Sequence, residues 1–81
     1  MLSYNINSFE AANRLTKMCD KYKDVVAIDV IYGRYTVDGS SILGVHSLSG
    51  HIVSIDPQTT DKNILKQIED DLQKITEENE K

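Results

Sequence analysis

The hydrophobic residues of the chain follow two kinds of spacing. Alternation with a period of two is typical of a half-buried strand, and steps of three and four residues place apolar side chains on one face of a helix. The period of two predicts four strands, over residues 2–6, 26–30, 34–37 and 51–55. The longer steps predict a first helix over 8–23 and a last helix with an apolar stripe over 64–75.

Polar residues with capping chemistry mark where the two long helices begin. Asn7 precedes the first helix and Glu10 follows three residues later, the spacing of a capping box. Thr59 or Thr60 is expected to cap the last helix, because a threonine hydroxyl can accept a hydrogen bond from a free N–H of the first turn. Residues 77–81 carry no apolar anchor, so we expect them to form a frayed tail.

A short helix is predicted between the third and fourth strands. Ser40 or Ser41 can cap its start, and Gly50 can end it. Glycine costs roughly 1 kcal/mol relative to alanine inside a helix, so Gly44 indicates close packing. The helix is apolar on more than one side, which exceeds the needs of a core stripe and favours contact with a partner. Its apolar residues are Ile42, Leu43, Val45 and Leu48.

The predicted elements follow the order β-α-β-β-α-β-α. Strands that alternate with amphipathic helices favour one sheet with the helices packed on a single face. The chain has 81 residues, of which 40% are hydrophobic and 27% charged, a balance typical of a globular domain. We therefore expect one domain over residues 1–81, of the α+β open-faced sandwich class.

Charge and composition restrict the cellular location and the kinds of partner that we expect. The net charge of −4 would repel a phosphate backbone, and no apolar run approaches the roughly 20 residues of a membrane span. The amino terminus lacks the layout of a signal peptide. Cys19 is the single cysteine, so no internal disulfide is expected, and its place on the inner face of the first helix indicates an inert core thiol. We expect a soluble cytoplasmic protein that binds neither nucleic acid nor membranes.

The sequence shows no constellation of catalytic or cofactor-binding residues. His46 and His51 are the only histidines, and their spacing with Cys19 matches no metal site. The glycines are scattered and form no phosphate-binding loop. We therefore expect no metal, no cofactor and no enzymatic activity.

Residues 41–48, which read Ser-Ile-Leu-Gly-Val-His-Ser-Leu, resemble the serine-helix motif of the HPr family. HPr is the histidine-containing phosphocarrier of the bacterial phosphoenolpyruvate-dependent sugar phosphotransferase system. The resemblance extends from about Tyr4 to Leu72. It implies four antiparallel strands in the order 1-4-2-3 with three helices on one face.

The other signature of the family is missing from the chain. The family reads Gly-Leu-His-Ala-Arg-Pro-Ala at the start of the first helix, where residues 6–12 here read Ile-Asn-Ser-Phe-Glu-Ala-Ala. Ser8 falls at the position of the phospho-accepting histidine and Glu10 at that of the arginine. A serine hydroxyl is a poor nucleophile without an activating base, and its phosphate ester is too stable to pass on. A carboxylate in place of a guanidinium changes about 4 kcal/mol of attraction into repulsion at an effective dielectric constant of about 20.

The resemblance also implies a regulatory and a partner-docking site on the short helix. Ser41 matches the serine that HPr kinase/phosphorylase modifies, after which the family binds a catabolite-control transcription regulator; the alternative is that Ser41 serves only as an N-cap. The docking positions correspond to Ile42, Leu43, His46 and Ser47. His46 replaces a residue that is commonly methionine, so the choice of partner can differ.

Three functional hypotheses follow. The first is a non-catalytic HPr-like protein that acts by protein contacts in sugar transport and catabolite repression. The second keeps phosphotransfer from enzyme I, with His46 or His51 as a relocated acceptor. The third is an HPr scaffold reused for an unrelated partner. A monomer and a homodimer are both compatible with the sequence.

Overall fold

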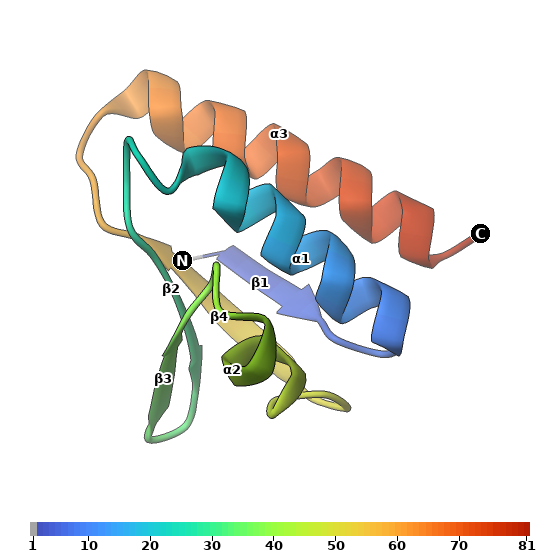
Figure 1. Cartoon of the computed structure of the whole chain (residues 1–81). Helices are drawn as coiled ribbons and strands as arrows, with labels where there is room; N and C mark the ends of the chain where they lie inside the picture. Colours follow the sequence, from blue (N-terminus) through green and yellow to red (C-terminus); the bar gives the residue numbers. More distant parts are fainter. Residues whose placement is uncertain (1) are drawn as a thin grey trace.

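The chain folds into a four-stranded antiparallel sheet with three helices on one face (Figure 1). The computed structural model describes residues 2–81. Its elements are β1 (Leu2–Asn5), α1 (Phe9–Tyr22), β2 (Ile28–Tyr32), β3 (Tyr35–Asp38), α2 (Ile42–His46), β4 (Ile52–Pro57) and α3 (Lys62–Asn79). The strand order is β1-β4-β2-β3. The predicted fold class and strand order are thus confirmed.

The core lies between the sheet and the helices. Alternate strand residues such as Tyr4, Val30 and Val53 face the helices and are buried. The buried residues of α1 are Ala11, Ala12, Leu15, Met18, Cys19 and Tyr22. The buried side chains within residues 2–81 are hydrophobic, and the hydroxyl of the buried Tyr4 donates to the backbone oxygen of Ala11 at 2.6 Å. None of the helices in the same range is long and apolar enough to cross a membrane.

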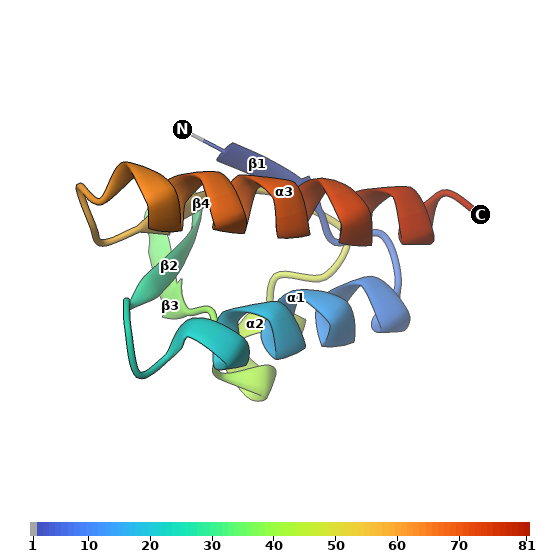
Figure 2. The same ribbon diagram turned by 90° about the horizontal axis from the view of Figure 1, so that it is seen from above.

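Helices α1 and α3 run antiparallel, side by side (Figures 1 and 2). At one end, Asp71 Oδ2 accepts hydrogen bonds from Lys21 Nζ at 2.8 Å and from the Tyr22 hydroxyl at 2.5 Å. At the other end, Arg14 Nε lies 3.3 Å from a carboxylate oxygen of Glu78. Polar contacts therefore fix the register of the two helices at both ends of their shared face.

The carboxyl end of α3 is longer and better anchored than the sequence suggests. The helix continues to Asn79, so the expectation of a frayed tail over residues 77–81 is corrected for its first three residues. The side-chain amide of Asn79 donates to the Tyr4 hydroxyl at 2.7 Å, and its Oδ1 accepts from Arg14 at 2.6 Å. These polar contacts replace the apolar anchor that the tail lacks.

Two predicted caps are wrong by one or two residues. Ser8, not Asn7, caps α1, and its Oγ accepts from the backbone N–H of Ala11 at 3.0 Å. Asp61, rather than either threonine, caps α3 and accepts from two backbone N–H groups. Serine, threonine, asparagine and aspartate are all good caps. Where several of them follow one another, the path of the backbone determines which one becomes the N-cap.

All four strands differ from their predicted ranges by one or two residues at one or both ends. Strand β2 begins at Ile28, and Val26 is buried in the connection that precedes it. Strand β4 extends to Pro57, two residues beyond the predicted end at residue 55. Pro57 pairs with Ile28 at the very end of the strand, where a missing N–H interrupts no further ladder bond.

Cys19 occupies the core position that the sequence predicts. Its side chain is buried, and burial followed by the nearby charge of Asp38 raises the pKa of the thiol to about 12. A Cβ atom at Gly39 would come within 2.5 Å of Cys19 Sγ. Glycine is therefore required where the chain leaves β3 and passes close to α1 toward α2.

Asp71→Ala should lower the free energy of unfolding at pH 7 by roughly 1–2 kcal/mol. Burial alone raises the pKa of Asp71, but hydrogen bonds from Lys21 and Tyr22 outweigh it and hold the pKa below its ordinary value. The stabilisation is therefore complete above the unfolded pKa of about 3.9 and is lost as the pH falls through the folded value. Urea unfolding from pH 7 down to pH 2 measures this.

The matched control is Asp70→Ala, which removes the 3.8 Å pair with Lys66 on the exposed side of α3. It should change the unfolding free energy by less than about 0.5 kcal/mol at any pH. Equal effects of the two substitutions, or a difference between wild type and Asp71→Ala that persists at pH 2, would contradict the assigned role of Asp71.

Candidate functional site

Helix α2 is held against the body of the protein by a single buried side chain. Val45 is fully buried, and α2 packs against α1 and β3. A Cβ atom at Gly44 would lie 3.1 Å from Val37 Cβ and 3.2 Å from Ser41 Oγ. The close packing predicted for Gly44 is thus confirmed, and it brings α2 tightly onto β3.

The other large apolar side chains of α2 point away from the core. Leu43 is 82% exposed and Ile42 is 51% exposed. Phe9, in the first turn of α1, is 67% exposed. Phe9 lies three residues before the buried Ala12, a spacing that would favour the inner face of α1. At 100° per residue, however, it lies roughly a third of a turn from the centre of the buried stripe.

His46 connects α2 to the first turns of α1. Its ring centroid lies 4.7 Å from that of Phe9, with the planes tilted by 41°. Its Nε2 lies 3.1 Å from the side-chain oxygen of Asn13, an acceptor, so Nε2 carries the hydrogen in this pair. Ile42 precedes His46 by one turn and Leu43 precedes Ser47 by one turn, which makes each pair neighbours on the helix.

These contacts define one connected surface, which we call the α2 surface. It consists of Phe9, Ile42, Leu43, His46 and Ser47. Four of these residues occupy the docking positions that the resemblance implies, and the structure adds Phe9. The available signal for Phe9 was its place beside Ser8, at the start of the helix that the resemblance makes functional.

Ser41 is the N-cap of α2, which resolves the choice between the two adjacent serines. Its exposed Oγ accepts from the backbone N–H of Gly44 at 3.3 Å. Ser40 instead donates to Asp38 Oδ1, from its backbone N–H at 2.9 Å and from its hydroxyl at 2.8 Å. These two hydrogen bonds lower the pKa of Asp38, so the carboxylate remains charged beside the cap.

The first turn of α1 carries no activated nucleophile. Ser8 Oγ accepts a backbone hydrogen bond as the N-cap, and Glu10 is exposed. Across residues 2–81, no hydrogen bond joins Ser8 to a histidine or a carboxylate that could remove its proton. Ser8 therefore has a capping role here, without the base that nucleophilic catalysis requires.

The second histidine lies on another side of α2. The His51 ring stacks on Tyr32 with centroids 4.1 Å apart. A groove of about 250 Å³ is lined there by Tyr32, Tyr35, Ser47, Leu48 and His51. Because Ser47 belongs to both, this aromatic groove continues the α2 surface toward the β2–β3 hairpin. The histidines are therefore not brought together.

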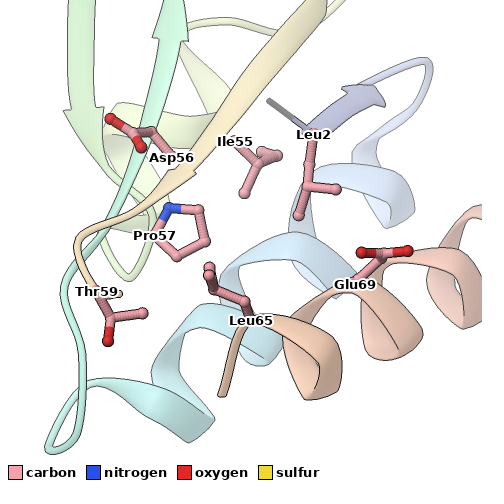
Figure 3. Close-up of a pocket in the computed structure, with 7 residues that line it drawn as sticks. All are labelled: Leu2, Ile55, Asp56, Pro57, Thr59, Leu65 and Glu69. Carbon is pink, nitrogen blue, oxygen red and sulfur yellow. The ribbon is translucent and has the colours of Figure 1, made fainter. Parts of the chain in front are cut away.

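A different hollow, of about 410 Å³, lies between β1, β4 and the first turns of α3 (Figure 3). Leu2, Ile55 and Leu65 point into it, and the carboxylates of Asp56 and Glu69 lie on opposite sides of this apolar group (Figure 3). The hollow offers no histidine, cysteine or cation for chemistry. In the described part of the chain, no three histidine, cysteine or acidic side chains gather as a metal site.

Comparison with known proteins identifies no relative. No family model matches the chain, and no curated protein or solved structure is significantly similar to it. A fold alone is compatible with many functions, so we infer the function from the exposed side chains and their contacts.

Ser41→Ala should destabilise α2 by roughly 1 kcal/mol, the usual cost of losing an N-cap. The effect should be local, since Val45 and the α1–α3 core remain in place. Native-state hydrogen exchange would show it as faster exchange at the amide of Gly44, which donates to Ser41 Oγ. Ser49→Ala removes an exposed hydroxyl outside the cap and is the control. Unchanged exchange at Gly44 would contradict the capping role.

Proposed function

We propose that the chain is an HPr-like, cytoplasmic interaction domain that binds protein partners through the α2 surface and does not relay phosphoryl groups. The observation that carries the proposal is the exposure of three large apolar side chains, Phe9, Ile42 and Leu43, around one histidine. Exposed apolar groups that cluster in this way are typical of protein interaction sites.

The fold supports the HPr-like part of the proposal. The resemblance implies strand order 1-4-2-3 with three helices on one face, and the sheet has this order. It also implies a phospho-accepting site at the start of the first helix and a partner-docking site on the short helix. The contact between Phe9 and His46 places these two elements on one surface.

The first turn of α1 is unsuited to a phosphoryl relay. A phosphoryl relay needs a nucleophile whose phosphorylated form retains high transfer potential, and Ser8 is an N-cap hydroxyl. Glu10 adds a negative charge where a phosphoryl group would need a positive one. Ser8 and Glu10 are both compatible with a protein that binds partners but transfers no phosphoryl group to them.

Regulation through Ser41 is part of the same proposal. The hydroxyl is exposed and therefore accessible to HPr kinase/phosphorylase, the enzyme that the resemblance implies. A phosphate would add about −1.5 to −2 charges within the α2 surface region, so partner affinity would change on modification. The negative charge of Asp38 opposes this modification, because Asp38 lies three residues before Ser41 and accepts a hydrogen bond from the backbone N–H of Ser40.

The first test measures binding to purified HPr kinase/phosphorylase by titration calorimetry. Leu43→Ser and Phe9→Ser should each weaken binding at least tenfold, because each removes an exposed apolar group from the α2 surface. Neither should change the unfolding free energy by more than about 0.5 kcal/mol, since both side chains are largely outside the core. A parallel incubation with ATP should place phosphate on Ser41.

The matched control is Ile52→Thr. Ile52 is 66% exposed, close to the value for Phe9, but it alternates with the buried Val53 and so lies on the open face of the sheet. Its replacement should leave binding unchanged. Binding that survives Leu43→Ser and Phe9→Ser would contradict docking by the α2 surface, and an unphosphorylated Ser41 would contradict the regulatory role.

A second candidate function is phosphotransfer through His46. The observation in its favour is the position of His46 beside the first turns of α1, where the family places its acceptor. In such a step an imidazole nitrogen would bond to phosphorus as the bond from phosphorus to the donor enzyme breaks. The imidazole would lose its N–H proton, and the leaving group of the donor enzyme would take up a proton in exchange. The ring contacts found are with Phe9 and Asn13, and neither is a cation that could hold a phosphoryl group.

Incubation with enzyme I and labelled phosphoenolpyruvate separates the two candidates. The proposal predicts no acid-labile phosphate on the wild-type chain. Label that disappears in His46→Gln but remains in His51→Gln would favour the second candidate and overturn the absence of a relay.

A further inference from the structure

A second groove, of about 440 Å³, lies between α1 and α3. It shares no residue with the α2 surface. Helices α2 and α3 lie on opposite sides of α1 (Figures 1 and 2), so the groove and the α2 surface are separated by the body of that helix. Its lining consists of Arg14, Lys17, Met18, Lys21, Asp71, Lys74, Ile75 and Glu78.

The groove is positive in a chain that is negative overall. Four of its lining side chains are cations and two are carboxylates, which leaves a surplus of two positive charges, whereas the whole chain carries −4. Arg14, Lys17 and Lys21 follow one another at steps of three and four residues and so share one side of α1. Lys74 lines the groove from α3.

Two of the four cations are already paired. Arg14 contacts Glu78 and Lys21 contacts Asp71, at 3.3 and 2.8 Å. Within residues 2–81, no ion pair involves Lys17 or Lys74. The surplus charge of the groove is therefore carried by these two lysines, one on each wall.

The floor of the groove is apolar. Met18 is 6% exposed, and Ile75 is partly buried against the same core. The aliphatic stems of Arg14 and Lys21 border this floor. An apolar floor between basic walls is complementary to a segment that presents apolar side chains flanked by carboxylates.

We propose that the groove between α1 and α3 binds an acidic amphipathic helix of a partner protein, with its carboxylates at Lys17 and Lys74 and its apolar side chains on Met18 and Ile75. This would be a second docking site, independent of the α2 surface. The charge complementarity of the two lysines selects an acidic occupant. Nucleic acid is disfavoured, because a phosphate backbone has no counterpart to the apolar floor formed by Met18 and Ile75, and binding it takes more phosphate contacts than two lysines supply.

The probe for the test is a fluorescein-labelled synthetic helix of glutamate and leucine, with leucines at steps of three and four. The comparison peptide carries lysine in place of every glutamate. Fluorescence anisotropy with the full chain should show binding of the glutamate peptide alone. The affinity should fall several-fold when the ionic strength rises from about 0.05 M to 0.3 M, because salt screens exposed charges.

Lys17→Glu and Lys74→Glu should each weaken binding at least tenfold, and Lys17→Gln and Lys74→Gln should weaken it less. Lys66→Glu is the matched control: it changes the net charge equally, but Lys66 pairs with Asp70 on the far side of α3. It should change the affinity less than twofold. Equal urea midpoints for these variants would show that each is folded.

Three outcomes would overturn the proposal. One is equal weakening by Lys17→Glu and Lys66→Glu, which would mean only a long-range charge effect. Another is loss of peptide binding in Leu43→Ser with full binding in Lys17→Glu, which would place the peptide on the α2 surface. The third is self-association of the chain, seen by sedimentation and abolished by Lys17→Glu, which would make a second copy the occupant.

Discussion

The structure depends on the burial of α1, which shares one apolar core with the sheet and contacts a helix on each side. Six of its fourteen residues are buried, and none of these six is charged. Once α1 is covered by the sheet, α2 and α3, the core is complete. Helix α2 has only five residues, of which Val45 is the one that is buried. Its other large apolar side chains, Ile42 and Leu43, therefore lie outside the core and belong to the α2 surface that we propose as the partner-docking site.

The same core leaves most polar side-chain contacts near the surface. Its buried side chains are hydrophobic, and the hydroxyl of the buried Tyr4 donates to the backbone oxygen of Ala11. The polar contacts lie at the edges, as between Asp71 and Tyr22 or between Arg14 and Glu78. Helices α2 and α3, which carry parts of the two proposed docking sites, lie on opposite sides of α1 (Figure 2).

Much of the fold can be predicted from hydrophobic spacing, because the strands alternate cleanly and the stripes of α1 and α3 are long. The strand order required the HPr resemblance. The caps are less predictable, since Asn7 and Ser8 are equally suitable by residue type and only the chain path selects Ser8. Four residues of the α2 surface could be identified from the motif. Phe9 could not, because the hydrophobic spacing of α1 does not show that its first turn is left exposed by the rest of the fold. The α1–α3 groove could not be predicted at all: Lys17 and Lys74 are far apart in sequence and meet only through helix pairing.

The central claim is that the α2 surface, and not the open face of the sheet, is the face that phosphotransferase-related partners contact. Amide chemical-shift mapping of the labelled chain during titration with HPr kinase/phosphorylase tests it most directly. The account predicts that shifts concentrate at Phe9, Leu43, His46 and Ser47, with Ile52 and its strand neighbours unchanged. Shifts centred on Ile52 and the open sheet face, or no shifts at concentrations where the same enzyme binds an authentic HPr, would contradict it.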